Sequence, residues 1–140
     1  ENIEYYGKGP HENYIDMCHH VKVGYYKSTV TDEYVPYIKP QEHGNHTNVK
    51  YLLVCDDHGL GLEFSSKEPF ECNASHYTSE ELTRAQHSFE LEPSGTTIVR
   101  IDYKVSGLGS NSCGPELIEK YRLKEKDFQY SFKVKPVKNK

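Results

Sequence analysis

One segment of this 140-residue sequence carries the signals of a helix, and that scarcity limits the fold more than any other feature. In the stretch HYTSEELTRAQH, Thr78 stands three residues before Glu81, a capping box in which each side chain can bond the other residue's backbone amide. Leu82 and Ala85 give the segment one apolar edge. The pattern predicts one short helix near residues 79–86, so most of the core must come from strands.

Short strand-like stretches separated by turn signals make up most of the remaining sequence. The turn DDHGLG lies between two of them and predicts a hairpin. The predicted strands cover residues 21–30, 49–56, 60–66, 69–75, 96–107 and 127–135. Together they predict an all-β fold, an antiparallel β-sandwich.

The segment EYVPYIKPQEHGNHTN (33–48) has two prolines and a glycine, which predicts a long extended connection instead of a central strand. The chain is the size of a single domain, which we expect over residues 1–135. Residues 136–140, in the basic end KPVKNK, are predicted to be a flexible tail.

Composition excludes two classes of partner. The net charge of −4 does not fit a nucleic-acid-binding surface, and no apolar run is long enough to cross a membrane. The four cysteines (Cys18, Cys55, Cys72 and Cys113) form no CxxC motif and are interpreted as free thiols, with one or two disulfides as the alternative. Without an initiating Met or a visible signal peptide, we expect a mature or excised fragment.

Two glycine-rich stretches, GKGP (7–10) and GLG (107–109), superficially resemble nucleotide-binding loops. A phosphate loop needs a strand before it and a helix N-terminus after it, and HENY after Pro10 does not supply the helix. We therefore expect tight turns in which glycine takes a positive φ.

The histidines and paired carboxylates also have structural explanations. Neither Cys18-His19-His20 nor His43-x-x-His46 has a second pair at zinc-site spacing. Asp56-Asp57 lies in a predicted turn, where Asp bonds its own backbone, and Glu80-Glu81 lies in the first helical turn, where negative charge suits the dipole. These local motifs alone give a β-domain without a metal centre or a catalytic centre.

Five stretches of this sequence resemble motifs of a known family, and they occur in the same order as in that family. They are YYGKGPHENYIDM (5–17), STVTDEYVPYIKPQEHGNHTNVKYL (28–52), PFECNASHYTSEELTRAQH (69–87), DYKVSGLGSNSCGPEL (102–117) and YRLKEKDFQYSFKV (121–134). The first is similar to the glycine-proline-glutamate-asparagine-tyrosine motif near the end of large β-galactosidases of glycoside hydrolase family two. The others resemble the segments that follow it, so the resemblance covers nearly the whole chain.

This resemblance implies the second half of a galactose-mutarotase-like supersandwich, from an enzyme that hydrolyses terminal non-reducing β-D-galactose residues with retention. It implies that the acid/base and nucleophile glutamates lie on a separate barrel domain, so the isolated chain is expected to be inactive. No cofactor is expected in this segment, and any Mg or Na would bind in other domains. The implied partners are the remaining domains and galactosides, in a homo-oligomer of the bacterial cytoplasm or periplasm.

The resemblance also implies a loop that stacks a tryptophan on the sugar, and this sequence has no Trp. By alignment that loop corresponds to residues 58–69, near Ser65 and Ser66, and many members have a tryptophan where Cys113 stands. An aromatic ring can stack on the apolar face of a pyranose. Phe64, Phe70 and Tyr51 are candidate replacements, each with a core or sheet position as the alternative.

The polar segment PQEHGNH is predicted to line a sugar-facing cleft through Gln41, Glu42, Asn45 and His46, with Phe64 as the aromatic contact. The alternative is that these polar residues tie down a loop between prolines. The opening motif is interpreted as architecture: a glycine-proline turn in which side chains satisfy loop backbone groups. Those side chains are Glu12, Asn13 and Asp16.

Two rival functions remain open at this point: an independent carbohydrate-binding module, and an oligomer-interface domain without catalysis. Half of a supersandwich must leave surfaces that the absent strands once covered. We therefore expect a large exposed apolar patch along one edge of the sheet.

Overall fold

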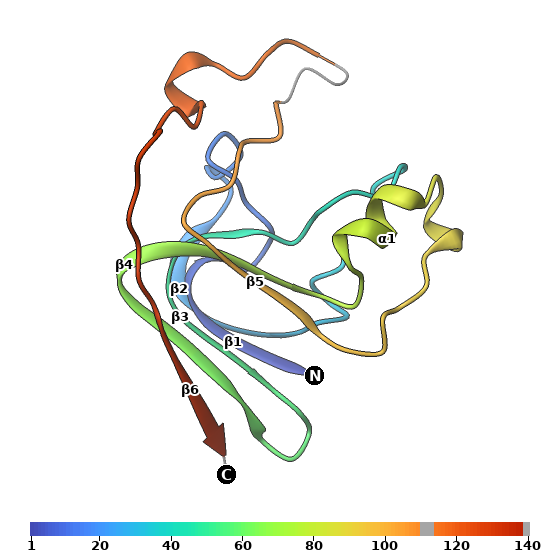
Figure 1. The fold of residues 1–140 in the computed structure, drawn as a ribbon, viewed down its shortest axis with the longest axis vertical. Helices are drawn as coiled ribbons and strands as arrows, with labels where there is room; N and C mark the ends of the chain where they lie inside the picture. Colours follow the sequence, from blue (N-terminus) through green and yellow to red (C-terminus); the bar gives the residue numbers. More distant parts are fainter. Residues whose placement is uncertain (110–113, 139–140) are drawn as a thin grey trace.

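The computed structural model of this protein describes residues 1–109 and 114–138. It consists of strands β1 (Asn2–Gly9), β2 (Lys22–Thr29), β3 (His46–Cys55), β4 (Leu60–Ser75), β5 (Ile98–Asp102) and β6 (Lys133–Lys138), with helix α1 (Ser79–Arg84) and the 3-10 turns η1 (Ser88–Glu90) and η2 (Glu119–Tyr121). All strand pairs are antiparallel, and the strands form one curled sheet (Figure 1). The all-β fold class is confirmed, and the arrangement is consistent with the expected sandwich.

The sheet has the strand order β2-β1-β3-β4-β5, and β6 also pairs with β4. β5 and β6 pair with different halves of the long strand β4. The half from Leu60 to Ser65 pairs with β6, and the half from Glu71 to Ser75 pairs with β5. Between these halves β4 bends, and its pairing with β3 shifts register. At the bend Pro69 has no N–H to donate to a ladder, so neither neighbour continues past it.

The core lies on one face of the sheet, because side chains alternate between its two faces. In β1, Ile3 and Tyr5 are buried while Glu4 and Tyr6 point the other way. The buried cluster comprises Ile3, Tyr5, Val30, Val49, Leu52, Val54, Phe64, Phe70, Cys72 and Ala74. Each large side chain fully buried in this way stabilises the fold by about 1.5–3 kcal/mol.

The predicted helix is confirmed, and so is half of its capping box. Thr78 Oγ1 accepts a hydrogen bond from the amide of Glu81 at 3.1 Å. Glu81 does not reach back to Thr78. Its carboxylate instead pairs with Arg84 and accepts from the amide of Glu92 at 2.9 Å, which ties the helix to the chain that follows it.

The glycine motifs differ from the expected positive-φ turns. Positive φ occurs at Gly44, Gly59 and Gly95, whereas Gly7 lies inside β1. A Cβ on Gly7 would stand 2.7 Å from Cγ2 of Val49, so Gly7 is needed because the neighbouring strand passes too close for a side chain. Gly107 likewise leaves room for the carboxylate of Asp16.

Several strand predictions differ from the structure, and the strand predicted over residues 96–107 spans only Ile98–Asp102 as β5. Residues 60–66 and 69–75 belong to one bent strand, β4, and residues 2–9, where no strand was predicted, form β1. The final strand begins at Lys133, not near residue 127, because the pairing with β4 ends where β4 bends. It runs to Lys138, so residues 136–138 are paired and do not form a tail.

The predicted hairpin is confirmed: β3 and β4 are joined by a turn with Gly59 at positive φ. Asp56 bonds its own backbone as expected, since its carboxylate accepts from the amides of His58 and Leu60. Cys18, Cys55 and Cys72 are free thiols, and Cys113 lies outside the described residues. Within the described part of the chain, no helix has the length and apolar character needed to cross a membrane.

Candidate functional site

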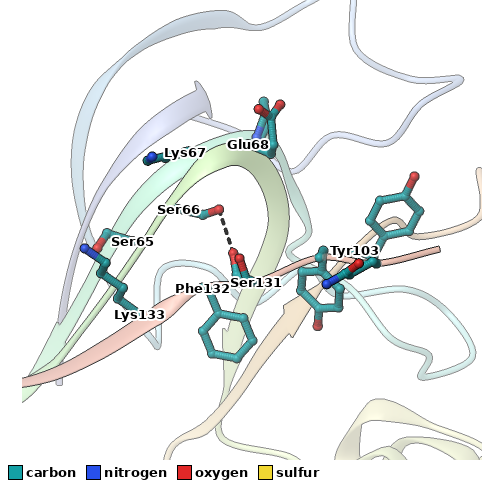
Figure 2. Close-up of a pocket in the computed structure, with 11 residues that line it drawn as sticks. Ser65, Ser66, Lys67, Glu68, Tyr103, Ser131, Phe132 and Lys133 are labelled. Carbon is teal, nitrogen blue, oxygen red and sulfur yellow. Dashed lines mark hydrogen bonds between the residues drawn. The ribbon is translucent and has the colours of Figure 1, made fainter.

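An open groove of about 1030 Å³ lies where β4 bends, between that bend and the segment that leads into β6 (Figure 2). The chain reaches it from three places. β4 contributes Ser65–Pro69, the segment after β5 contributes Tyr103, and the segment entering β6 contributes Gln129–Lys133. The groove therefore brings together residues about 65 positions apart in the sequence, as Ser66 and Ser131 show.

Two hydrogen bonds hold the walls of the groove in place. Ser66 Oγ donates to the carbonyl oxygen of Ser131 at 2.8 Å, the dashed contact in Figure 2. Tyr130 Oη donates to the carbonyl oxygen of Ile101 in β5, also at 2.8 Å. Residues 128–132 thus run beside the sheet without joining its ladder, and side-chain bonds take the place of strand pairing.

A row of aromatic rings passes through the groove: Tyr103, Tyr130 and Phe132 line it, while Phe128 lies in the adjoining pocket. Phe128 stacks on Tyr103 with ring centroids 4.8 Å apart and planes 7° apart. Tyr103 lies 5.8 Å from Tyr130, which lies 5.8 Å from Phe132. Phe132 in turn lies 6.4 Å from the buried ring of Phe64. Because Phe128, Tyr130 and Phe132 are 60%, 37% and 39% exposed, the row has free apolar surface.

Polar and charged groups surround this apolar row: Ser65, Ser66, Lys67, Glu68, Gln129 and Lys133 also line the groove. An aromatic floor with hydroxyl, amide and charged groups around it can stack on one face of a sugar ring and bond its hydroxyls. In the described part of the chain, Glu68 is the single carboxylate in the lining, whereas hydrolysis of a glycosidic bond needs two.

A second region, around the first residues of β3, collects buried polar side chains from β3, β4 and the loops around them. We refer to Asn13, Glu33, Asn45, His46, Thr47 and Glu71 as the polar cluster. Asn13, fully buried, donates to the carbonyls of Lys8 and His11 and accepts from the amide and hydroxyl of Thr47. Within residues 1–109 and 114–138, Thr97 Oγ1 is the one buried side-chain polar atom without a partner. The polar cluster is therefore satisfied internally.

Two carboxylates of the polar cluster are buried with specific partners. Glu33 Oε2 lies 2.7 Å from Nε2 of His46, and both side chains are almost fully buried. Glu71 Oε2 accepts from Nδ2 of Asn45 at 2.8 Å. Burial raises the pKa of Glu71 above its usual range, although the bond from Asn45 partly opposes this. The protonation of Glu71 therefore depends on whether the chain is folded.

The opening turn has the architecture expected from the sequence. Glu12 accepts from the amide of Gly44 at 2.8 Å and from the hydroxyl of Tyr37. Asp16 accepts from the amides of Leu108 and Gly109 at 3.0 and 2.9 Å. These side chains, with Asn13, satisfy backbone groups of loops distant in sequence, as predicted.

The predicted sugar-facing residues do not lie together. Gln41 and Glu42 are exposed, and Glu42 accepts from Ser79 Oγ and pairs with Arg100. Asn45 and His46 are 5% and 3% exposed, with their side-chain nitrogens bonded inside the polar cluster. Phe64 pairs with Leu52, six residues along β3 from His46, which separates the two groups by about 20 Å of strand.

The aromatic candidates occupy core or sheet positions. Phe64 and Phe70 are buried, and Tyr51 is half-buried on the opposite face of the sheet from Phe64. The groove's own rings, Tyr103, Tyr130 and Phe132, were not predicted as site residues. The alternation of aromatic residues in 128–132 was the available signal, and it was interpreted as a strand face. Within the described residues no cluster of three or more His, Cys, Asp or Glu side chains could hold a metal ion.

The sequence is similar to known proteins over nearly its whole length. Residues 1–134 match the family of beta galactosidase small chains. The chain belongs to that family. It is 43% identical over 130 residues to a beta-galactosidase of Actinobacillus pleuropneumoniae and 39% identical over 135 residues to one of Staphylococcus xylosus. It is also 36% identical over 133 residues to a beta-galactosidase of Kluyveromyces lactis.

These alignments cover very different shares of the two proteins. They include 93%, 96% and 94% of this chain but only 12%, 14% and 13% of the three relatives. The chain therefore spans about one-eighth of the length of the relatives it matches. The remainder of those beta-galactosidases lies outside the aligned segments.

Proposed function

We propose that this chain is the C-terminal portion of a β-galactosidase that hydrolyses terminal non-reducing β-D-galactose residues with retention, and that it borders the substrate without supplying the catalytic glutamates. The observation that carries the proposal is family membership over residues 1–134, with relatives about eight times as long. The other domains, galactosides and further copies of the enzyme are its proposed partners.

The groove is the proposed point of contact with substrate. It includes Ser65–Pro69, which lie in the segment that aligns with the family's sugar-stacking loop. Its partly exposed rings offer a surface for stacking on a sugar in a chain that has no Trp. Phe64 supports this surface from below, since its buried ring lies against Phe132. Gln41 and Glu42, which are exposed, remain proposed sugar contacts, while Asn45 and His46 hold their loop in place.

A single lining carboxylate supports the proposal that the chain alone is inactive. A retaining glycosidase needs a nucleophile and an acid/base about 5–5.5 Å apart, and the groove offers Glu68 alone within the described residues. We propose that both catalytic carboxylates come from a domain outside this chain.

The test compares the isolated chain with the full-length protein that carries it, using nitrophenyl β-D-galactoside and lactose as substrates. The full-length protein is expected to hydrolyse both and to release the β-anomer of galactose first, as followed by NMR, while the isolated chain hydrolyses neither. A full-length protein without galactosidase activity that still binds galactosides would support the carbohydrate-binding module instead.

The role of the groove has its own test in the full-length enzyme. Replacing Phe132 with Ala removes a half-exposed ring and is expected to raise KM for lactose. The matched control is Phe89→Ala in η1, which is 83% exposed and outside the groove. An unchanged KM in Phe132→Ala would contradict substrate contact at the groove.

A further inference from the structure

The buried ring of His46 faces acceptor atoms at both of its nitrogens. Nδ1 lies 3.1 Å from the carbonyl oxygen of Lys8 in β1, and Nε2 lies 2.7 Å from Oε2 of Glu33. A carbonyl oxygen can only accept, so Nδ1 must carry a hydrogen. Because a neutral imidazole has a single N–H, two arrangements remain at Nε2. Either the ring is doubly protonated beside a carboxylate, or the carboxyl group of Glu33 holds the second proton.

Three observations favour the doubly protonated ring. An imidazole nitrogen ordinarily binds a proton about a hundredfold more tightly than a carboxylate does. The ring of Tyr5 lies against His46, with centroids 4.3 Å apart, and the π-system of a tyrosine attracts a cation. Within the described residues, the one ion pair of Glu33 is with His46, so an ionised Glu33 needs a charged ring beside it in this buried site. The surroundings therefore suit an imidazolium with Glu33 as its counter-ion.

Cys72 and Tyr5 also pack against this pair, and both stay neutral. Cys72 on β4 stands directly opposite His46, and burial, together with the nearby carboxylate of Glu33, raises the pKa of its thiol well above the usual range. Burial and the same carboxylate likewise raise the pKa of Tyr5. Tyr26 on β2 lies behind Tyr5, with ring centroids 5.3 Å apart. The charge of this site is therefore decided by the protons that His46 and Glu33 hold.

The pair lies where a long connection meets the sheet. Glu33 lies in the turn after β2, and His46 is the first residue of β3. Residues 33–45 between these strands contain no strand or helix, and we refer to them as the connection. The connection also carries Gln41 and Glu42, which are exposed. Contact between Glu33 and His46 thus joins the two ends of the connection.

We propose that His46 is held as an imidazolium at neutral and mildly alkaline pH, and that its ion pair with Glu33 holds the connection against the sheet. Loss of the proton would leave the carboxylate buried without a counter-ion, so the connection opens as pH rises. The imidazole of the unfolded chain gives up its proton near pH 6.5, roughly the ordinary value. The stabilisation is therefore fully present below about pH 6.5 and is lost as pH rises beyond it. This inference goes beyond the proposed function.

NMR of the histidine ring nitrogens tests the protonation of His46 directly. In the wild-type chain at about pH 8, where an ordinary imidazole is neutral, we expect both ring nitrogens of His46 to carry a hydrogen. His87 is the matched control, because its pair with Glu90, at 2.9 Å, is largely exposed, and it should show one protonated nitrogen. One protonated nitrogen at His46 would overturn the inference, since the second proton would then be on Glu33 or lost.

Hydrogen exchange in the full-length protein, read by mass spectrometry, tests whether the ion pair holds the connection. Glu33→Gln keeps the size of the side chain and removes its charge, so exchange within residues 34–45 should become about tenfold faster. Glu90→Gln, which removes the partner of His87, is the matched control and should leave that exchange unchanged. Equal exchange in the two variants would overturn the role of the ion pair.

The pH dependence has its own measurement. The excess of the wild-type Tm over that of Glu33→Gln should shrink as pH is raised from about 6 to about 9, because the wild type alone has an ion pair to lose. A constant difference across this range would overturn the pH-dependent opening. The ring-nitrogen measurement uses the wild type alone, so it decides the inference even if Glu33→Gln does not fold.

Discussion

The polar cluster lies around the start of β3, the groove lies where β4 bends beside the middle of β3, and the two regions use polar side chains in opposite ways. In the polar cluster, the side chains of Asn13 and Asn45 are buried and form hydrogen bonds with other residues of the chain. In the groove, Lys67 and Glu68 are exposed and surround rings that are themselves partly exposed. A polar residue in a loop motif is thus no sign of ligand contact. Such a residue can contact a ligand only if its side-chain donors and acceptors are not already hydrogen-bonded within the chain.

The largest expected effect comes from breaking the polar cluster at its centre. Asn13→Ala leaves the amide and hydroxyl of Thr47 without their acceptor in a buried site, and it removes the part-buried bonds to the carbonyls of Lys8 and His11. Each unsatisfied buried group costs about 1–3 kcal/mol, so we expect a loss of about 3 kcal/mol or more in the free energy of unfolding. Urea denaturation measures it.

Asn2→Ala is the matched control, since exposed Asn2 makes one side-chain bond, to Asp57. It should change stability by less than about 0.5 kcal/mol. Equal losses in the two variants would show that the polar cluster is no more important to the fold than a surface asparagine.

The pH dependence of stability tests whether Glu71 in the polar cluster is held in a desolvated site. Burial raises its pKa above the usual 4.5, so the folded chain holds this proton more tightly than the unfolded chain does. The resulting stability is fully present below pH 4.5 and is lost as pH rises through the raised pKa. Relative to Glu71→Gln, the wild type should therefore become less stable between acid and neutral pH.

Thermal unfolding from pH 4 to 7 measures that difference, with Glu68→Gln in the exposed groove lining as the control. A constant difference between wild type and Glu71→Gln across this range would mean that Glu71 is not held in a desolvated site.

The ring row of the groove is expected to contribute less to stability than the polar cluster. Tyr103 contacts both Phe128 and Tyr130, and each aromatic pair contributes about 0.5–1.5 kcal/mol. Tyr103→Ala should therefore cost about 1–3 kcal/mol. Tyr103→Phe keeps the ring and should cost little. A loss in Tyr103→Phe as large as in Tyr103→Ala would indicate that the hydroxyl, and not the stacking, matters.

The smallest effect is expected at the wall of the groove. Ser66→Ala removes one partly exposed hydrogen bond to the carbonyl of Ser131 and should cost about 0.5–1 kcal/mol. Ser131→Ala keeps that bond, because the acceptor is a backbone oxygen, and serves as the control. Greater loss in Ser131→Ala than in Ser66→Ala would contradict the assigned contact.

Sequence reasoning succeeded where local chemistry decides the structure. The cap at Thr78 and the turn at Asp56 follow from short-range rules. That Glu12, Asn13 and Asp16 bond loop backbone was also predicted, although which distant loops they bond was not. The protein family was likewise predicted correctly, because five stretches of the chain resemble family motifs and occur in the same order as in the family.

Sequence reasoning failed where a distant segment decides. Residues 128–132 alternate as a strand does, but β4 bends away at Pro69 and leaves them without a ladder to join. The groove forms in the space between the bend of β4 and residues 128–132. Asn45 and His46 have side chains suited to sugar binding, and only the packing of β1 and β4 around them shows that they are buried.

The most direct test of the contrast between the two regions is an NMR titration of the chain with galactose and lactose up to millimolar concentrations. We predict shifts at residues 65–69 and 129–133, which line the groove, and none at Asn45 or His46 in the polar cluster. Shifts confined to the polar cluster, or no shifts at the groove, would contradict the account.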